Sequence, residues 1–186
     1  MTIVMKFGGS SLATAEKIRH CAKLAKEGAN AVVVSAMGGT TDLLLELARE
    51  PKNPDLWQEL KANHEEAAKE LETDLGPILD QLHHLLLGIS AVGELTARSR
   101  DLVLSFGECL CAELFAAAMK LEGIPAQALT GGEAGIVTDN RFGEATPLMN
   151  ISLFQLKERL SQGDLPIITG FLGATQHGVV TTLGRG

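Results

Sequence analysis

The first 35 residues alternate a short apolar run, a helical pattern and a second apolar run, and this order limits the folds open to the chain. Residues 3–7 contain β-branched residues and end at Gly8-Gly9-Ser10-Ser11. Residues 31–35 include three consecutive valines without polar alternation, which is typical of a strand covered on both faces in a parallel sheet. Between them, apolar residues recur at helical spacing, at Ile18, Cys21, Ala22 and Ala25. The segment is predicted to form a βαβ unit.

Strand and helix patterns continue along the rest of the chain. We expect further strands at residues 126–129, 136–138, 165–169 and 179–183, and helices at residues 41–49, 109–122 and 151–161. Residues 170–173 are expected to form a loop, and 177–178 a turn. The stretch 55–105 is almost entirely helical in character and is interpreted as an insertion beside the sheet. The sequence thus predicts an α/β fold, a three-layer α/β/α sandwich with a mainly parallel sheet.

Charge and cysteine content exclude some classes of function. Sixteen Lys and Arg against 23 Asp and Glu give a net charge of −7 without a basic block, which argues against nucleic-acid binding. Three cysteines without a Cys-x-x-Cys pair argue against a zinc site and for a reducing compartment. We find neither a signal peptide nor a window of about 18 uninterrupted apolar residues, so we expect no membrane-spanning segment. The prediction is a soluble cytoplasmic protein.

Two glycine loops are the first candidate for chemistry. Gly8 and Gly9 follow Lys6 at the end of the first strand, so that a backbone and a positive charge can approach a phosphate. The segment Ser35-Ala36-Met37-Gly38-Gly39-Thr40-Thr41-Asp42 repeats this arrangement after the second strand. Loops at the carboxyl ends of neighbouring parallel strands share one crevice. The alternatives are a plain turn with a solvent-facing Lys6, and helix capping by Thr40 or Thr41.

Two further segments carry single charged residues. Glu108, in Ser105-Phe106-Gly107-Glu108, lies just before or within an apolar helix expected to start near Cys109. It could bind a substrate ammonium, or favour a helix start as a negative charge. Arg185 lies between glycines in Thr181-Thr182-Leu183-Gly184-Arg185-Gly186 and could make a bidentate contact with a carboxylate or phosphate. The alternative is a solvent-facing Arg near a chain terminus. His64, His83 and His84 are interpreted as solvated or partly buried surface residues, and no chemistry is assigned to them.

In this order, the segments resemble the aspartate kinases of the amino-acid kinase family. Lys6 to Ser11 is similar to that family's Lys-Phe-Gly-Gly-Thr-Ser opening, with Ser10 in place of Thr, and residues 35–42 are similar to its second loop. Residues 105–108 resemble its Ser-x-Gly-Glu segment. Residues 170–173 and 181–186 resemble its Gly-Phe-Ile-Gly and Thr-Thr-Leu-Gly-Arg-Gly elements.

The resemblance also implies a truncated domain. In the family the last element continues Gly-Ser-Asp, whose Asp organises phosphoryl transfer, whereas this sequence stops at Gly186. Residues 1–186 would therefore be the amino-terminal portion of an amino-acid kinase catalytic domain, with the helical insertion at about 55–105. The nucleotide-binding remainder and the regulatory domains would be absent. Such a chain is expected to be inactive alone.

The function implied by the resemblance is ATP-dependent phosphorylation of the β-carboxylate of L-aspartate to 4-phospho-L-aspartate, the first step toward lysine, threonine and methionine. ATP would bring Mg²⁺, no protein residue would ligate a metal, and the full-length protein would be a homo-oligomer. Lys6 would be catalytic and, with Gly8, Gly9 and Ser10, would bind the phosphates. The substrate would be held by Ser35, Thr41, Glu108, Arg185 and Gly186.

Two alternatives stay open. Another member of the same fold class would act on glutamate, acetylglutamate, carbamate or uridylate. Glu108 and Arg185 together favour a free amino acid, because a nucleotide or an acylated amine would leave Glu108 without a partner. The second alternative is a non-catalytic module that binds anions or oligomerises.

Overall fold

A computed structural model describes residues 2–160 and 163–184. It begins with the predicted βαβ unit, formed by β1 (Val4–Phe7), α1 (Ala15–Lys26) and β2 (Ala31–Val34). The two strands are parallel, and Val4 pairs with Ala31. A short 3₁₀ helix, η1 (Gly9–Leu12), separates β1 from α1. Thr14 caps α1, since its side chain accepts a hydrogen bond from the Lys17 amide.

The described strands form two sheets, A and B. The four strands of sheet A are parallel, in the order β1-β2-β5-β3, where β3 is Ala126–Leu129 and β5 is Leu165–Thr169. Sheet B has the order β4-β6-β7, with β4 at Val137–Thr138, β6 at Leu172–Thr175 and β7 at Val180–Thr182. β6 and β7 are antiparallel, and the predicted turn between them contains Gly178 at a φ of 75°. The loop expected at 170–173 is shorter, because β6 begins at Leu172.

Five further helices complete the described residues: α2 (Thr40–Arg49), α3 (Pro54–Glu70), α4 (Gly76–Val92), α5 (Ala97–Leu121) and α6 (Met149–Leu160). The expected helix start near Cys109 is wrong, because α5 begins twelve residues earlier and runs unbroken through Gly107. A Cβ atom at Gly107 would lie 2.9 Å from the Cβ of Ala36. This glycine therefore serves close packing within a helix and does not end one.

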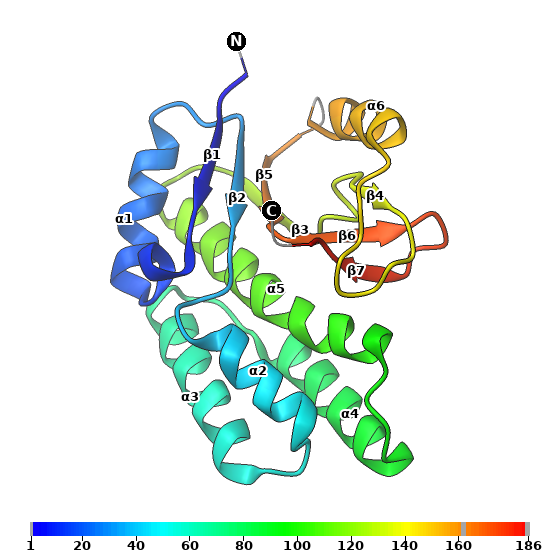
Figure 1. Ribbon diagram of the computed structural model, residues 1–186. Coiled ribbons are helices and arrows are strands. Elements are labelled where there is room, and N and C mark those ends of the chain that lie inside the picture. The colour runs from blue at the N-terminus through cyan, green and yellow to red at the C-terminus, as the bar shows by residue number, and fades with distance from the viewer. Residues whose placement is uncertain (1, 161–162, 185–186) are drawn as a thin grey trace.

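The helices cover the two faces of sheet A unequally (Figure 1). On one face α5 crosses the sheet, and the ring of Phe115 stacks on Phe7 of β1 at 5.5 Å. The core on this side continues without a break into leucines of α2, α3 and α4, so the helical stretch shares the core of the sheet. On the other face, α6 packs Leu156 and Leu160 against residues of β2, β3 and β5. The predicted α/β architecture with a mainly parallel sheet is confirmed.

α5 is the central structural element. Its 25 residues are long and apolar enough to cross a membrane, but 72% of its most apolar window is buried inside the fold, as in the core helix of a globular protein. Two of its three carboxylates are nonetheless buried. Asp101 is fully buried and Glu108 is 8% exposed. Because buried charges are costly without compensating hydrogen bonds, both positions point to a specific role.

Candidate active site

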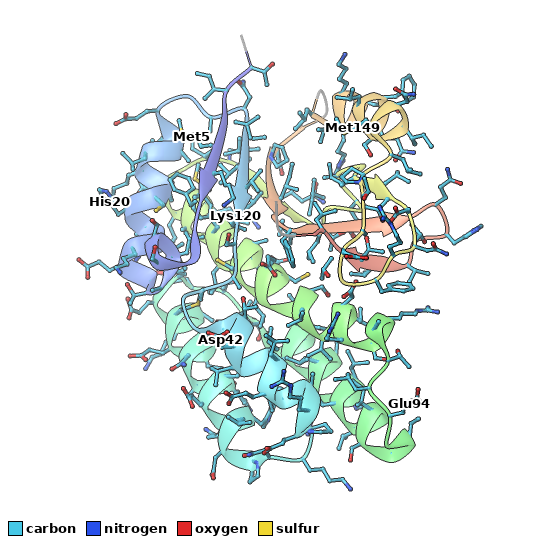
Figure 2. The ribbon with its side chains drawn as sticks, viewed as in Figure 1. Met5, His20, Asp42, Glu94, Lys120 and Met149 are labelled. Carbon is cyan, nitrogen blue, oxygen red and sulfur yellow. The ribbon has the colours of Figure 1, made fainter. Side chains whose placement is uncertain are left out.

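The two glycine loops pack against each other at the carboxyl ends of β1 and β2. A Cβ atom at Gly9 would lie 2.9 Å from the carbonyl oxygen of Ala36, and one at Gly38 would lie 3.3 Å from the carbonyl oxygen of Gly9. This close approach explains Gly9 and Gly38, and the positive φ of 85° explains Gly39, whereas a Cβ atom at Gly8 would meet nothing within 4 Å. Asp42, at the start of α2, lies beside these loops (Figure 2). The structure thus brings the two loops together at the edge where the sequence predicted a shared crevice.

The first loop turns before it reaches α1. Gly8 is extended, and its carbonyl oxygen accepts a hydrogen bond from the Ser11 amide at 3.0 Å within η1. Lys6 and Ser10 are both exposed. Because side chains alternate along a strand and Phe7 faces α5, Lys6 projects from the opposite face of sheet A. A second cation, Lys17, donates to the Ser10 carbonyl oxygen at 3.0 Å; the sequence analysis did not single it out.

The second loop is held by hydrogen bonds that the sequence did not reveal. The Ser35 amide donates to the Phe7 carbonyl oxygen at 3.2 Å, and Thr41 is half-buried in the first turn of α2. The N-cap residue of α2 is Gly39, with a φ of 85°, so the capping alternative for Thr40 and Thr41 is wrong. The buried Thr40 hydroxyl lies 3.5 Å from Nε2 of His64 instead.

His64 is a core residue, which corrects its interpretation as a surface side chain. It is 1% exposed, and Nδ1 lies 2.8 Å from the Leu60 carbonyl oxygen. A carbonyl oxygen can only accept, so Nδ1 carries the proton and Nε2 can accept from the Thr40 hydroxyl. Burial lowers the pKa of His64, which keeps the ring neutral. Its role is to anchor the second loop to α3.

Glu108 lies beside the same loops, in the middle of α5. The capping interpretation is therefore wrong, because eleven helical residues precede it. Burial raises the pKa of Glu108 from 4.5 to about 7, against the opposing effect of hydrogen bonds with the backbone at Glu108 and Ala36. Ala36 is therefore close to three residues of the site, since it lies next to Gly9 and Gly107 as well as Glu108. The site brings together two glycine loops and one buried carboxylate.

The ends of β5 and β7 reach the same region. The Gly170 amide donates to the Val34 carbonyl oxygen at 2.7 Å, which places the turn after β5 beside the end of β2. Phe171 has a φ of 61°, a strained value for an aromatic residue, and its carbonyl oxygen accepts from the Leu183 amide at 2.9 Å. Arg185 and Gly186 lie outside the described residues.

Sequence reasoning missed Asp101. Its Oδ2 accepts hydrogen bonds from the amides of Gly143 and Thr182, and its Oδ1 accepts one from the Thr182 hydroxyl. The signal was available, because Asp101 lies seven residues before Glu108 in a mainly apolar helix, on the same helical face. Its partners, however, are 42 and 81 residues away in the chain.

A separate cavity lies outside this site. It measures about 690 Å³ and lies between α5, α6 and sheet B, where Ser105, Glu133 and Gln155 contribute to its lining. None of the predicted site residues that the structure describes lines it. The candidate site is instead formed by the loops at the carboxyl ends of the parallel strands, where ligands of such sheets bind.

Two packed glycine loops at the carboxyl edge of a parallel sheet, with the buried carboxylate of Glu108 beside them, define the class of protein. The model of the amino acid kinase family matches residues 1–186, and the chain belongs to this family. The resemblance inferred from the motifs is confirmed.

The relatives define the class further. The chain is 40% identical to "Aspartokinase 1, chloroplastic" of Arabidopsis thaliana over its whole length, and 33% identical to the aspartokinase of Geobacillus stearothermophilus over 99% of its length. It spans 36% of the length of each of these relatives. A solved structure of E. coli aspartokinase III with lysine and aspartate superposes with a TM-score of 0.86 at 27% identity, covering 100% of this chain and 44% of the other.

Proposed function

We propose that the protein containing this chain transfers the γ-phosphoryl group of ATP to the β-carboxylate of L-aspartate, forming 4-phospho-L-aspartate. Glu108 is the observation that carries the proposal. A carboxylate whose pKa is raised by burial gains most from a cation that enters beside it, and the ammonium of a free amino acid is such a cation. The relatives are named aspartokinases, and E. coli aspartokinase III, which shares this fold, is described in complex with aspartate and ADP.

The glycine loops fit the phosphoryl-transfer half of the reaction. Lys6 would act as the catalytic charge and, with the backbone of Gly8, Gly9 and Ser10, would bind the phosphates of ATP. Mg²⁺ would come bound to ATP and would neutralise phosphate charge. The acceptor carboxylate is ionised at neutral pH and needs no general base, so the protein contributes position and charge neutralisation.

The remaining proposed contacts concern the two substrate carboxylates. Ser35 and Thr41 lie in or next to the second loop, where their hydroxyls can donate to a carboxylate oxygen. We assign Arg185 and Gly186 to the same substrate from the sequence alone. Together with Glu108, these groups match a molecule with two carboxylates and one ammonium.

We further propose that residues 1–186 are the amino-terminal portion of the catalytic domain, with an inserted helical segment at about 55–105. The outer edge of β1 supports this organisation. Within the described residues β1 pairs only with β2, and Val4 is 55% exposed, so this edge is free to accept further strands. The protein would work as a cytoplasmic homo-oligomer, and its product would lead to lysine, threonine and methionine.

The test uses the complete gene product that contains this chain. Glu108→Gln should raise the aspartate KM roughly tenfold or more, because the variant loses one charge-assisted hydrogen bond to the substrate. The ATP KM should stay unchanged. Glu113→Gln, on the same helix, is the matched control and should change neither KM. An unchanged aspartate KM in Glu108→Gln would contradict the role of Glu108. Turnover with an N-acetylated amino acid would instead favour another member of the family.

A further inference from the structure

The fully buried carboxylate of Asp101 has no role in the mechanism described so far. It accepts three hydrogen bonds, each between 2.8 and 2.9 Å, and all three donors lie outside its own helix. Two come from Thr182 of β7 and one from Gly143, in the loop that precedes α6. Asp101 thus joins α5 to two segments that are distant in sequence.

Asp101 and Glu108 both belong to α5. Seven residues correspond to almost two full turns, so both carboxylates lie on one face of the helix, about 10 Å apart along its axis. Glu108 is beside Ala36, in the loop after β2, and Asp101 is beside Thr182 of β7. The position of β7 relative to the substrate loop is therefore fixed through a single rigid helix.

The end of β7 is also held from other directions. The Thr182 carbonyl oxygen accepts a hydrogen bond from the Ala145 amide at 3.0 Å, and the Leu183 amide donates to the Phe171 carbonyl oxygen at 2.9 Å. Phe171 adopts its strained backbone conformation at this contact. Strain of this kind persists only where surrounding contacts enforce it, which indicates that the course of residues 182–184 is tightly determined.

We infer that Asp101 is a positioning residue that sets where the end of β7 lies relative to Glu108 in the proposed substrate site. The inference rests on the proposed function, because Arg185, assigned to a substrate carboxylate, follows Thr182 by three residues. Asp101 acts through hydrogen-bond geometry and does not touch the substrate. A displacement of β7 by about 1 Å is enough to weaken substrate alignment strongly.

Two substitutions of Asp101 separate geometry from charge. Asparagine can retain all three contacts, because its carbonyl oxygen can accept from both amides while the Thr182 hydroxyl turns to accept from its NH₂ group. Alanine removes all three. In the complete gene product, Asp101→Ala should raise the aspartate KM roughly tenfold or more, whereas Asp101→Asn should stay within about threefold of the wild type. If the asparagine variant loses as much as the alanine variant, charge is what matters and the inference is overturned.

Thr182→Val and Thr181→Val provide a matched pair on β7. Thr182→Val deletes the hydroxyl that binds Asp101, whereas Thr181→Val deletes a neighbouring buried hydroxyl that contacts Thr138, 2.8 Å away. Only Thr182→Val should raise the aspartate KM, even if both variants melt earlier. This pair also decides the matter if Asp101→Ala fails to fold. Equal KM values in the two variants would reduce Asp101 to a stabilising contact and overturn the inference.

A separate readout distinguishes this inference from the proposed function. If the wild-type gene product phosphorylates no aspartate, the proposed function fails, and the inference fails with it. If the wild type is active, hydrogen exchange decides whether the contact exists in solution. The amides of Gly143 and Thr182 should exchange faster in Asp101→Ala than in wild type, while amides within α5 remain protected. Unchanged exchange at both amides would overturn the inference in an active enzyme.

Discussion

Replacing Glu108 with glutamine should change how the stability of the chain depends on pH. Burial raises the pKa of Glu108 from 4.5 to about 7, so the folded chain binds this proton more tightly than the unfolded chain does. The stabilisation from the protonated form is fully present below pH 4.5 and is lost as the pH rises through 7. At about 1.36 kcal/mol per pH unit, ionisation of Glu108 lowers the free energy of unfolding by roughly 3 kcal/mol in total.

Glutamine has nearly the same shape and no charge, so Glu108→Gln should abolish the pH-dependent contribution of residue 108 to the free energy of unfolding. Urea unfolding at pH 5, 6, 7 and 8 measures the free energy of unfolding for both proteins. As the pH rises from 5 to 8, the free energy of unfolding of the variant should increase by roughly 2 to 3 kcal/mol relative to that of the wild type. The comparison removes the contribution of His64, whose lowered pKa affects both proteins equally.

A control on the same helix tests the cause. Ser105→Ala also alters a buried polar side chain of α5, but it does not titrate, so its difference from wild type should be constant with pH. If the curves of Glu108→Gln and wild type are parallel from pH 5 to pH 8, Glu108 ionises normally. The argument that its burial prepares it for a substrate ammonium would then be refuted.

Two further predictions concern the glycine loops and α5. In the complete gene product, Lys6→Ala should lower kcat by roughly 10²- to 10³-fold with little change in the aspartate KM, whereas Lys23→Ala on the exposed face of α1 should have no effect; near-normal turnover in Lys6→Ala would remove Lys6 from the mechanism. Gly107→Ala should destabilise the fold by about 1 to 3 kcal/mol because of its contact with Ala36, whereas Gly88→Ala in α4, where a Cβ meets nothing within 4 Å, should stabilise it by about 0.5 to 1 kcal/mol; equal shifts in urea unfolding would contradict the packing argument.

Local patterns were enough to predict the sheet. The uninterrupted valines of β2 indicated a strand buried on both faces, and in the structure Ala31, Val32 and Val34 are buried and Val33 is half-buried. The glycine pairs indicated close loops, because the backbone approach at Gly9 and Gly38 excludes larger side chains and so is visible in the sequence. The proximity of the loops then followed from parallel pairing.

The length of α5 and the role of Asp101 could not be predicted in the same way. Gly107 suggests a break when only its neighbours in sequence are considered, since its packing partner Ala36 is 71 positions away. Likewise, Asp101 finds all its hydrogen-bond donors in segments far along the chain, which no periodic pattern encodes. His64 was misjudged for a related reason, because its burial depends on how α3 packs against the second loop.

The central claim is that Glu108 recognises the ammonium of aspartate. Succinate has the same two carboxylates without the ammonium, so the ratio of kcat/KM for aspartate to that for succinate measures this recognition directly. For the complete gene product we predict that wild type prefers aspartate strongly and that Glu108→Gln loses roughly tenfold or more of this preference. A ratio that is the same in wild type and Glu108→Gln would contradict the account.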